Sequence, residues 1–147
     1  MVELEVVIAG CGLVLAVAAG LLAHEWTHAL VLELARVEYT ISIAPGRTGG
    51  IVGTLASCPW AVVRPRPTGG EPAWIFRLAA LAPLVLAVPV FVGIATGAVS
   101  HESPITTAVA IGWLACAIPS PQDFSVAFYA HSALESDRLE GVSVRDD

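Results

Sequence analysis

The sequence contains no lysine, and its seven basic residues are all arginine. Thirteen acidic residues give the 147-residue chain a net charge of −6, so the basic surface that nucleic-acid binding requires is missing. The three cysteines are an odd number and are scattered without metal-ligand spacing, which favours small buried side chains over a disulfide framework. We therefore expect neither a nucleic-acid partner nor a disulfide scaffold.

Charged residues make up only 14% of the chain, and hydrophobic residues make up 56%. The mean hydropathy of +0.76 is too high for an ordinary soluble protein and indicates a small membrane protein. A chain of this length forms about one domain, so we predict a single membrane-embedded domain over residues 1–147.

Three hydrophobic runs are long enough to cross a bilayer at a rise of about 1.5 Å per helical residue. We predict membrane-spanning helices over about residues 6–35, 74–100 and 104–122, and hence a mainly α, polytopic fold. The first run has a second interpretation as a secretory signal peptide, because Ala16 to Ala18 resembles a cleavage site. Glu3 and Glu5 stand where such a signal carries positive charge, which favours the membrane span.

Between the first and second spans, the residues from Val37 to Ile43 alternate between apolar and polar side chains, which is the period of a β-strand. Turn residues follow over 45–50, and residues 51–57 are a candidate return strand. We therefore predict a small β-hairpin over about residues 37–58, followed by irregular chain over residues 64–72.

The arginines predict the orientation of the spans. They lie in or beside the loop between the first two spans, or after the third span: Arg36, Arg47, Arg64, Arg66, Arg77, Arg138 and Arg145. The N-terminus and the loop near His101 contain none. By the positive-inside rule, we expect an integral protein of the cell membrane with its N-terminus outside and its C-terminus in the cytoplasm.

His24 and His28 lie four residues apart at the end of the first hydrophobic run, so one helix face presents both imidazoles, with Glu25 beside them. This is an HExxH motif, in which the histidines hold zinc and the glutamate is a general base toward the bound water. The alternative without a metal is two histidines at the membrane edge. Against it, the same face continues a row of small residues from Gly12, which turns the histidines toward other helices.

A catalytic zinc usually has a third protein ligand, and we predict Asp123. If the spans run straight, Asp123 and His24 lie at the same depth, about 27 Å from the outer face. Ser120 and Asp123 also match the start of a helix, so capping alone would explain the aspartate. The two roles do not exclude each other. His131 is a reserve ligand, although a solvated surface histidine is its simpler interpretation.

Together these residues resemble the site-2 protease-like intramembrane zinc metalloproteases, and especially their small zincin-peptidase relatives. The resemblance rests on His24-Glu25-Trp26-Thr27-His28 in the first span, an aspartate after prolines at the end of a later span, and the hairpin between the first two spans. In the larger relatives the aspartate precedes a glycine, whereas Phe124 follows Asp123 here.

The resemblance implies a zinc-dependent endopeptidase that hydrolyses membrane-associated protein substrates near the cytoplasmic face. One zinc ion per chain would be held by His24, His28 and Asp123, with Glu25 as the catalytic base; iron, cobalt or manganese also suit these ligands. The alternatives are a non-enzymatic membrane protein with a structural or metal-sensing or delivery site, and a scaffold without metal. The expected partners are a membrane protein or peptide substrate and the lipid bilayer, and the sequence leaves open a homo-oligomer.

Overall fold

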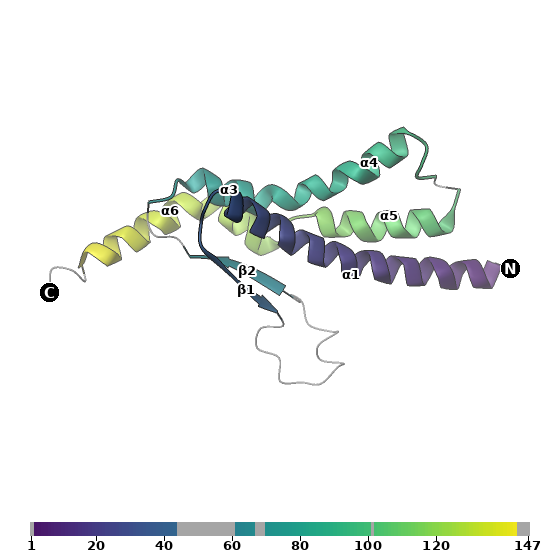
Figure 1. Cartoon of the computed structure of the whole chain (residues 1–147), viewed down its shortest axis with the longest axis horizontal. Helices are drawn as coiled ribbons and strands as arrows, with labels where there is room; N and C mark the ends of the chain where they lie inside the picture. The colour runs from purple at the N-terminus through teal and green to yellow at the C-terminus, as the bar shows by residue number, and fades with distance from the viewer. Residues whose placement is uncertain (1, 44–60, 67–69, 101, 144–147) are drawn as a thin grey trace. The chain divides into compact units, whose positions relative to one another are not determined.

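The computed structural model describes residues 2–43, 61–66, 70–100 and 102–143 (Figure 1). These residues form a mainly helical fold with a two-stranded antiparallel hairpin after the first helix, which confirms the predicted fold class. Three helical segments in them are long and apolar enough to cross a membrane, Glu3–Leu34, Ala73–Ala95 and Pro104–Ser132. The chain divides into two compact units, Met1–Trp26 with Pro83–Pro119, and Thr27–Ala82 with Ser120–Asp147.

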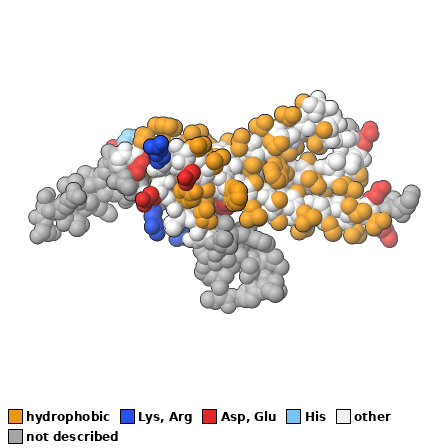
Figure 2. Space-filling view, in the orientation of Figure 1, with side chains coloured by type: hydrophobic (Ala, Val, Ile, Leu, Met, Phe, Trp, Pro, Cys, Tyr) orange, Lys and Arg blue, Asp and Glu red, His pale blue; other side chains and the backbone are white. Residues whose placement is uncertain are grey.

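Large hydrophobic side chains on the described helices are exposed, as expected for surfaces that face lipid. Leu15 of the first helix is 70% exposed and Phe91 of the second apolar segment is 62% exposed. Figure 2 shows hydrophobic side chains spread across the visible surface of the first unit. A surface of this kind is costly in water and suits a bilayer.

The first helix, α1 (Val2–Leu34), ends without the glycine that commonly terminates helices. Arg36 adopts the left-handed conformation instead, with φ of 57°. Its N–H donates to the carbonyl of Glu33 and the N–H of Val37 donates to the carbonyl of Leu32, which is the hydrogen-bond pattern of a Schellman cap. Leu32 and Val37 are both buried, so the apolar contact that accompanies this cap fixes the exit of the chain toward the hairpin.

The second apolar segment is a broken helix made of α3 (Ala73–Leu81), a 3₁₀ helix η1 (Ala82–Leu86) and α4 (Ala87–Ala95). Pro83 lies in η1, where a proline removes a backbone donor and disfavours the α-helix. The helix ends at Ala95, before the predicted residue 100. The Thr96 hydroxyl bonds back to the carbonyl of Val92, and Gly97 follows with φ of 76°, which reverses the chain.

In the first unit, α1 packs closely on α5 (Pro104–Ala117). A Cβ atom added to Gly20 would lie 2.8 Å from Cβ and Sγ of Cys116, and one added to Gly112 would lie 3.0 Å from the backbone oxygen of Leu13. The small residues of the two helices therefore let their backbones approach each other. On another side of α5, the indole N–H of Trp113 donates to the carbonyl of Leu86 at 2.8 Å.

The hairpin in the second unit pairs β1 (Tyr39–Ile43) with β2 (Ala61–Pro65), so that Ile41 lies opposite Val63. The return strand that we predicted at 51–57 lies outside the described residues. Residues 64 and 65, predicted to be irregular, belong to β2, which corrects that assignment. Pro65 fits at this position because it lies at the end of an edge strand, where an N–H toward β1 is not needed.

The third apolar segment breaks between α5 and α6 (Pro121–Ser143). Ile118 has an extended backbone with ψ of 125°, as expected for a residue that precedes a proline. In the second unit, α6 packs on α3 around a core that includes Phe76, Ala79 and Ala130. The predicted third span, 104–122, therefore contains a break, and its continuation is a separate helix in the second unit.

The close contact at Gly20 gives a test of the packing in the first unit. We expect Gly20→Ala to destabilise the protein by about 1–3 kcal/mol, because the new methyl group meets Cys116. Gly10→Ala is the matched control on the same helix, since no described atom lies within 4 Å of its added Cβ. Thermal unfolding in detergent measures the difference, and equal midpoints for the two variants would contradict the packing.

Candidate metal site

The HExxH motif lies on the last three turns of α1. His24 and His28 are both buried, each with only 8% of its surface exposed, and Glu25 is partly buried. Because both histidines belong to one continuous helix, their spacing of four residues places them on one face, one turn apart. Buried imidazoles require hydrogen-bond partners, and these partners determine which ring nitrogen each histidine presents.

In the first unit, Nδ1 of His24 lies 2.7 Å from the backbone carbonyl oxygen of Cys116. A carbonyl oxygen only accepts hydrogen bonds, so the proton is on Nδ1 and the imidazole donates it. In the neutral ring, Nε2 then carries the lone pair that a metal ion requires. The close approach of α5 to α1 at Gly20 brings this carbonyl within reach of His24.

In the second unit, Nδ1 of His28 lies 2.8 Å from the backbone carbonyl oxygen of Ala79 on α3. The same argument assigns the proton to Nδ1, and Nε2 of His28 is again the lone-pair nitrogen. Metal-ligating histidines almost always donate their other ring N–H to a carboxylate, a carbonyl or water, which orients the ring. Both histidines of this motif have that arrangement, each with a carbonyl from another helix.

Asp123 caps the start of α6, and its carboxylate also faces His28. Oδ2 accepts the N–H of Ser120 at 2.6 Å, and the N–H of Asp123 donates to the Ser120 hydroxyl at 3.2 Å, which is a reciprocal capping box. Oδ1 lies 3.3 Å from Nε2 of His28. Oδ2 therefore caps the helix, as predicted, and Oδ1 remains directed at His28, where it could serve as a metal ligand.

The distance between Oδ1 of Asp123 and Nε2 of His28 has a chemical consequence. Nε2 of the neutral imidazole and Oδ1 of the carboxylate are both acceptors, so an attraction between them requires either a proton shared by the two groups or a metal ion. In a tetrahedral zinc site with ligand distances of about 2.0 Å, neighbouring ligand atoms are about 3.3 Å apart. The donor set and this spacing therefore fit zinc.

His24 joins this pair through α1. His24, His28 and Asp123 together supply three ligand atoms, and these residues form a group that could hold a metal ion. The spacing along α1 relates His24 to His28, and the contact between Nε2 of His28 and Oδ1 of Asp123 in the second unit relates His28 to Asp123. Two histidines and one carboxylate leave a position for water, as in catalytic zinc sites.

The other candidate ligands lie elsewhere. His131 is exposed on α6, and its Nδ1 lies 3.6 Å from Glu135 one turn later, as expected for a solvated pair. His101 lies outside the described residues. The carbonyls of Cys116 and Ala79 were missed by the sequence analysis, because a backbone oxygen has no residue-type signal. The sequence signs that the third span breaks here were the prolines on each side of Ser120 and the capping pattern of Ser120 with Asp123.

Comparisons with known proteins give no further assignment: no protein-family model, curated protein or solved structure matches this chain. The membrane character and the grouped ligands therefore rest on the residues themselves.

Asp123→Asn separates the two roles of this side chain. The amide oxygen can still accept the Ser120 N–H, so we expect α6 to begin at the same residue. Zinc affinity should fall by about 100-fold or more, which is the upper end of the losses seen when an outer-shell partner of a metal ligand is removed. Competition with a chromophoric chelator measures the affinity, and circular dichroism measures the helix content. Asp123→Ala is the comparison variant that loses both roles. Wild-type zinc affinity in Asp123→Asn would show that Asp123 is a cap and not a ligand.

Proposed function

We propose that this chain is a membrane-embedded zinc-dependent endopeptidase that hydrolyses membrane-associated protein substrates near the cytoplasmic face. The observation that carries the proposal is the matched orientation of the two HExxH histidines. Each donates Nδ1–H to a backbone carbonyl, and a carboxylate oxygen lies 3.3 Å from Nε2 of His28. We further infer a relation to the site-2 protease-like metalloproteases from the motif and the order of its elements.

The residues of the group suit zinc, and His24, His28 and Asp123 would hold one ion per chain. A zinc ion supplies Lewis-acid chemistry, which polarises a carbonyl group and makes water more acidic. Glu25 follows His24 directly on α1, where its carboxylate can take a proton from the attacking water and return it to the leaving amine. The two carbonyl partners hold the imidazoles in one tautomer during this exchange.

A substrate helix conceals its carbonyls in its own hydrogen bonds, so it has to unwind before cleavage. The outer edge of β1 supports a way to hold the unwound segment. The N–H of Arg66 donates to the carbonyl of Glu38 at 2.7 Å, and with the strand register this directs the backbone groups of Tyr39 and Ile41 away from β2. An extended peptide would pair there by β-augmentation.

The proposed orientation follows from the arginines of the sequence. The loop that contains the hairpin carries most of them, and the positive-inside rule places it on the cytoplasmic side, with the N-terminus outside. The HExxH motif lies near the end of α1 that leads into this loop. Cleavage would therefore occur at the cytoplasmic edge of the membrane.

Glu25→Gln distinguishes the peptidase from a protein whose metal is structural, sensed or delivered. We expect this variant to keep its zinc, and to lose at least about 100-fold in cleavage of a tagged single-span membrane protein in liposomes, because the amide cannot accept the proton. Glu5→Gln, the same change near the start of α1, is the matched control with wild-type cleavage. Equal cleavage by the wild type and Glu25→Gln would show that Glu25 is not the catalytic base. If both proteins bind metal and neither cleaves the substrate, the non-enzymatic alternative would be favoured.

A further inference from the structure

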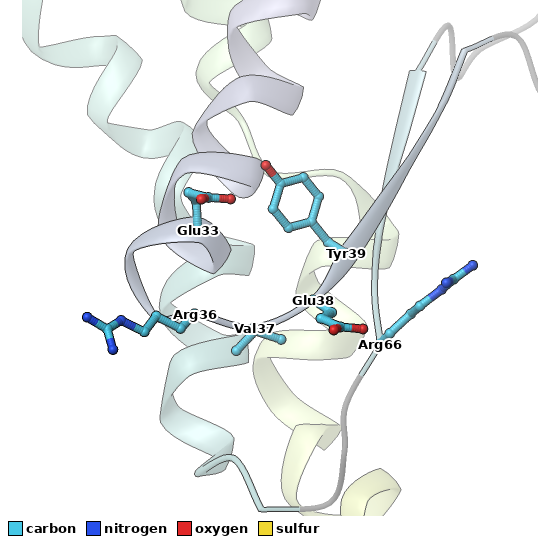
Figure 3. Close-up of a pocket in the computed structure, with 6 residues that line it drawn as sticks. All are labelled: Glu33, Arg36, Val37, Glu38, Tyr39 and Arg66. Atoms are coloured by element: carbon cyan, nitrogen blue, oxygen red, sulfur yellow. The ribbon is translucent and has the colours of Figure 1, made fainter.

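A second site lies in the second unit, where α1 ends and β1 begins. An open cavity of about 570 Å³ is lined by Glu33, Arg36, Val37, Glu38, Tyr39 and Arg66 (Figure 3). Tyr39 belongs both to this lining and to β1, whose outer edge we propose to bind substrate. The cavity is therefore placed to receive a side chain from a peptide on that edge.

The polar groups that face each other in this cavity are acidic and aromatic. In Figure 3 the Glu33 carboxylate and the Tyr39 hydroxyl point toward each other, whereas the guanidinium groups of Arg36 and Arg66 extend away from them on opposite sides. Burial, the negative charge of Glu33 and a hydrogen bond to its carboxylate all raise the pKa of Tyr39. The phenol is neutral at physiological pH, so its hydroxyl can donate a hydrogen bond to the Glu33 carboxylate.

The end of α1 adds to the negative potential of the cavity. A helix carries a partial negative charge at its C-terminus, and the last turn of α1 contains no basic side chain to offset it. Glu33 lies in that turn, so its charge and the helix end act together. A carboxylate next to an aromatic ring is a favourable environment for an ammonium or guanidinium group.

We propose that this cavity receives a lysine or arginine side chain of the substrate segment that pairs with the outer edge of β1. The inference rests on the proposed function and adds a substrate class to it. Membrane proteins concentrate lysine and arginine in the cytoplasmic segments that flank their spans. A preference for such a residue would direct the site to the cytoplasmic flank of a membrane span.

The test measures peptide binding to the full-length wild-type protein in detergent with EDTA present. The probe is a capped, fluorescein-labelled peptide of alternating threonine and valine with a central lysine, and matched peptides carry norleucine or glutamate at that position. We expect the lysine peptide to bind about fivefold more tightly than the norleucine peptide, as one partly exposed ion pair allows, and the glutamate peptide to bind most weakly. The preference should decrease at high salt.

Two variants locate the binding. Glu33→Gln should lower the affinity of the lysine peptide to that of the norleucine peptide. Glu5→Gln, the matched change elsewhere on α1, should leave the preference for lysine unchanged. Ile41→Pro removes an outward N–H without touching the β1–β2 ladder and should weaken all three peptides, whereas Ile41→Val should not.

Equal binding of the three peptides, or unchanged binding in Ile41→Pro, would overturn the inference. Tightest binding of the glutamate peptide would also overturn it and would assign the cavity to anions through Arg36 and Arg66. Because EDTA is present, the result does not depend on zinc. If the protein prefers the lysine peptide but cleaves no substrate, only the proposed peptidase function is contradicted. If it cleaves substrate but shows no preference for the lysine peptide, only the inference about the cavity is contradicted.

Discussion

The hydrogen bond from each imidazole Nδ1–H to a backbone carbonyl is the interaction on which the site depends. A histidine at the edge of a hydrocarbon layer has two nitrogens and several ways to satisfy them, and only a fixed donor on Nδ1 leaves Nε2 for a metal ion. The carbonyl for His24 comes from α5 and the carbonyl for His28 comes from α3. Helix packing in the first unit therefore determines the tautomer of His24, and helix packing in the second unit determines the tautomer of His28.

The breaks in the apolar segments have a related origin. Within a membrane, a helix end exposes backbone groups that require partners inside the protein. Where α5 stops and α6 starts, Ser120 and Asp123 satisfy each other, and the second carboxylate oxygen remains directed at His28. The same acidic side chain thus completes a helix start and supplies the third member of the group. Capping holds the carboxylate in place before any ion binds, which lowers the entropic cost of forming a metal site.

Much of this arrangement could be predicted from the sequence. Uncharged hydrophobic runs predict the spans, the four-residue spacing predicts the histidine face, and Ser120 with Asp123 predicts the start of α6. The missing parts depend on contacts that residue types do not report. Arg36 ends α1 in a conformation that usually selects glycine, and β2 ends in Arg64 and Pro65, which are typical of loops. The carbonyl partners of the histidines follow only from how the helices pack.

We propose that His24, His28 and Asp123 bind zinc, and elemental analysis of the detergent-purified protein would detect the ion. We expect about one zinc ion per chain in the wild type and almost none in His24→Ala. His131→Ala should keep full occupancy, because the exposed His131 side chain pairs with Glu135 and is not a member of the group. Well-folded wild-type protein that contains no metal, even after zinc is supplied, would show that these three residues do not form a zinc site. That result would leave a membrane protein in which His28 and Asp123 lie beside each other without a metal ion.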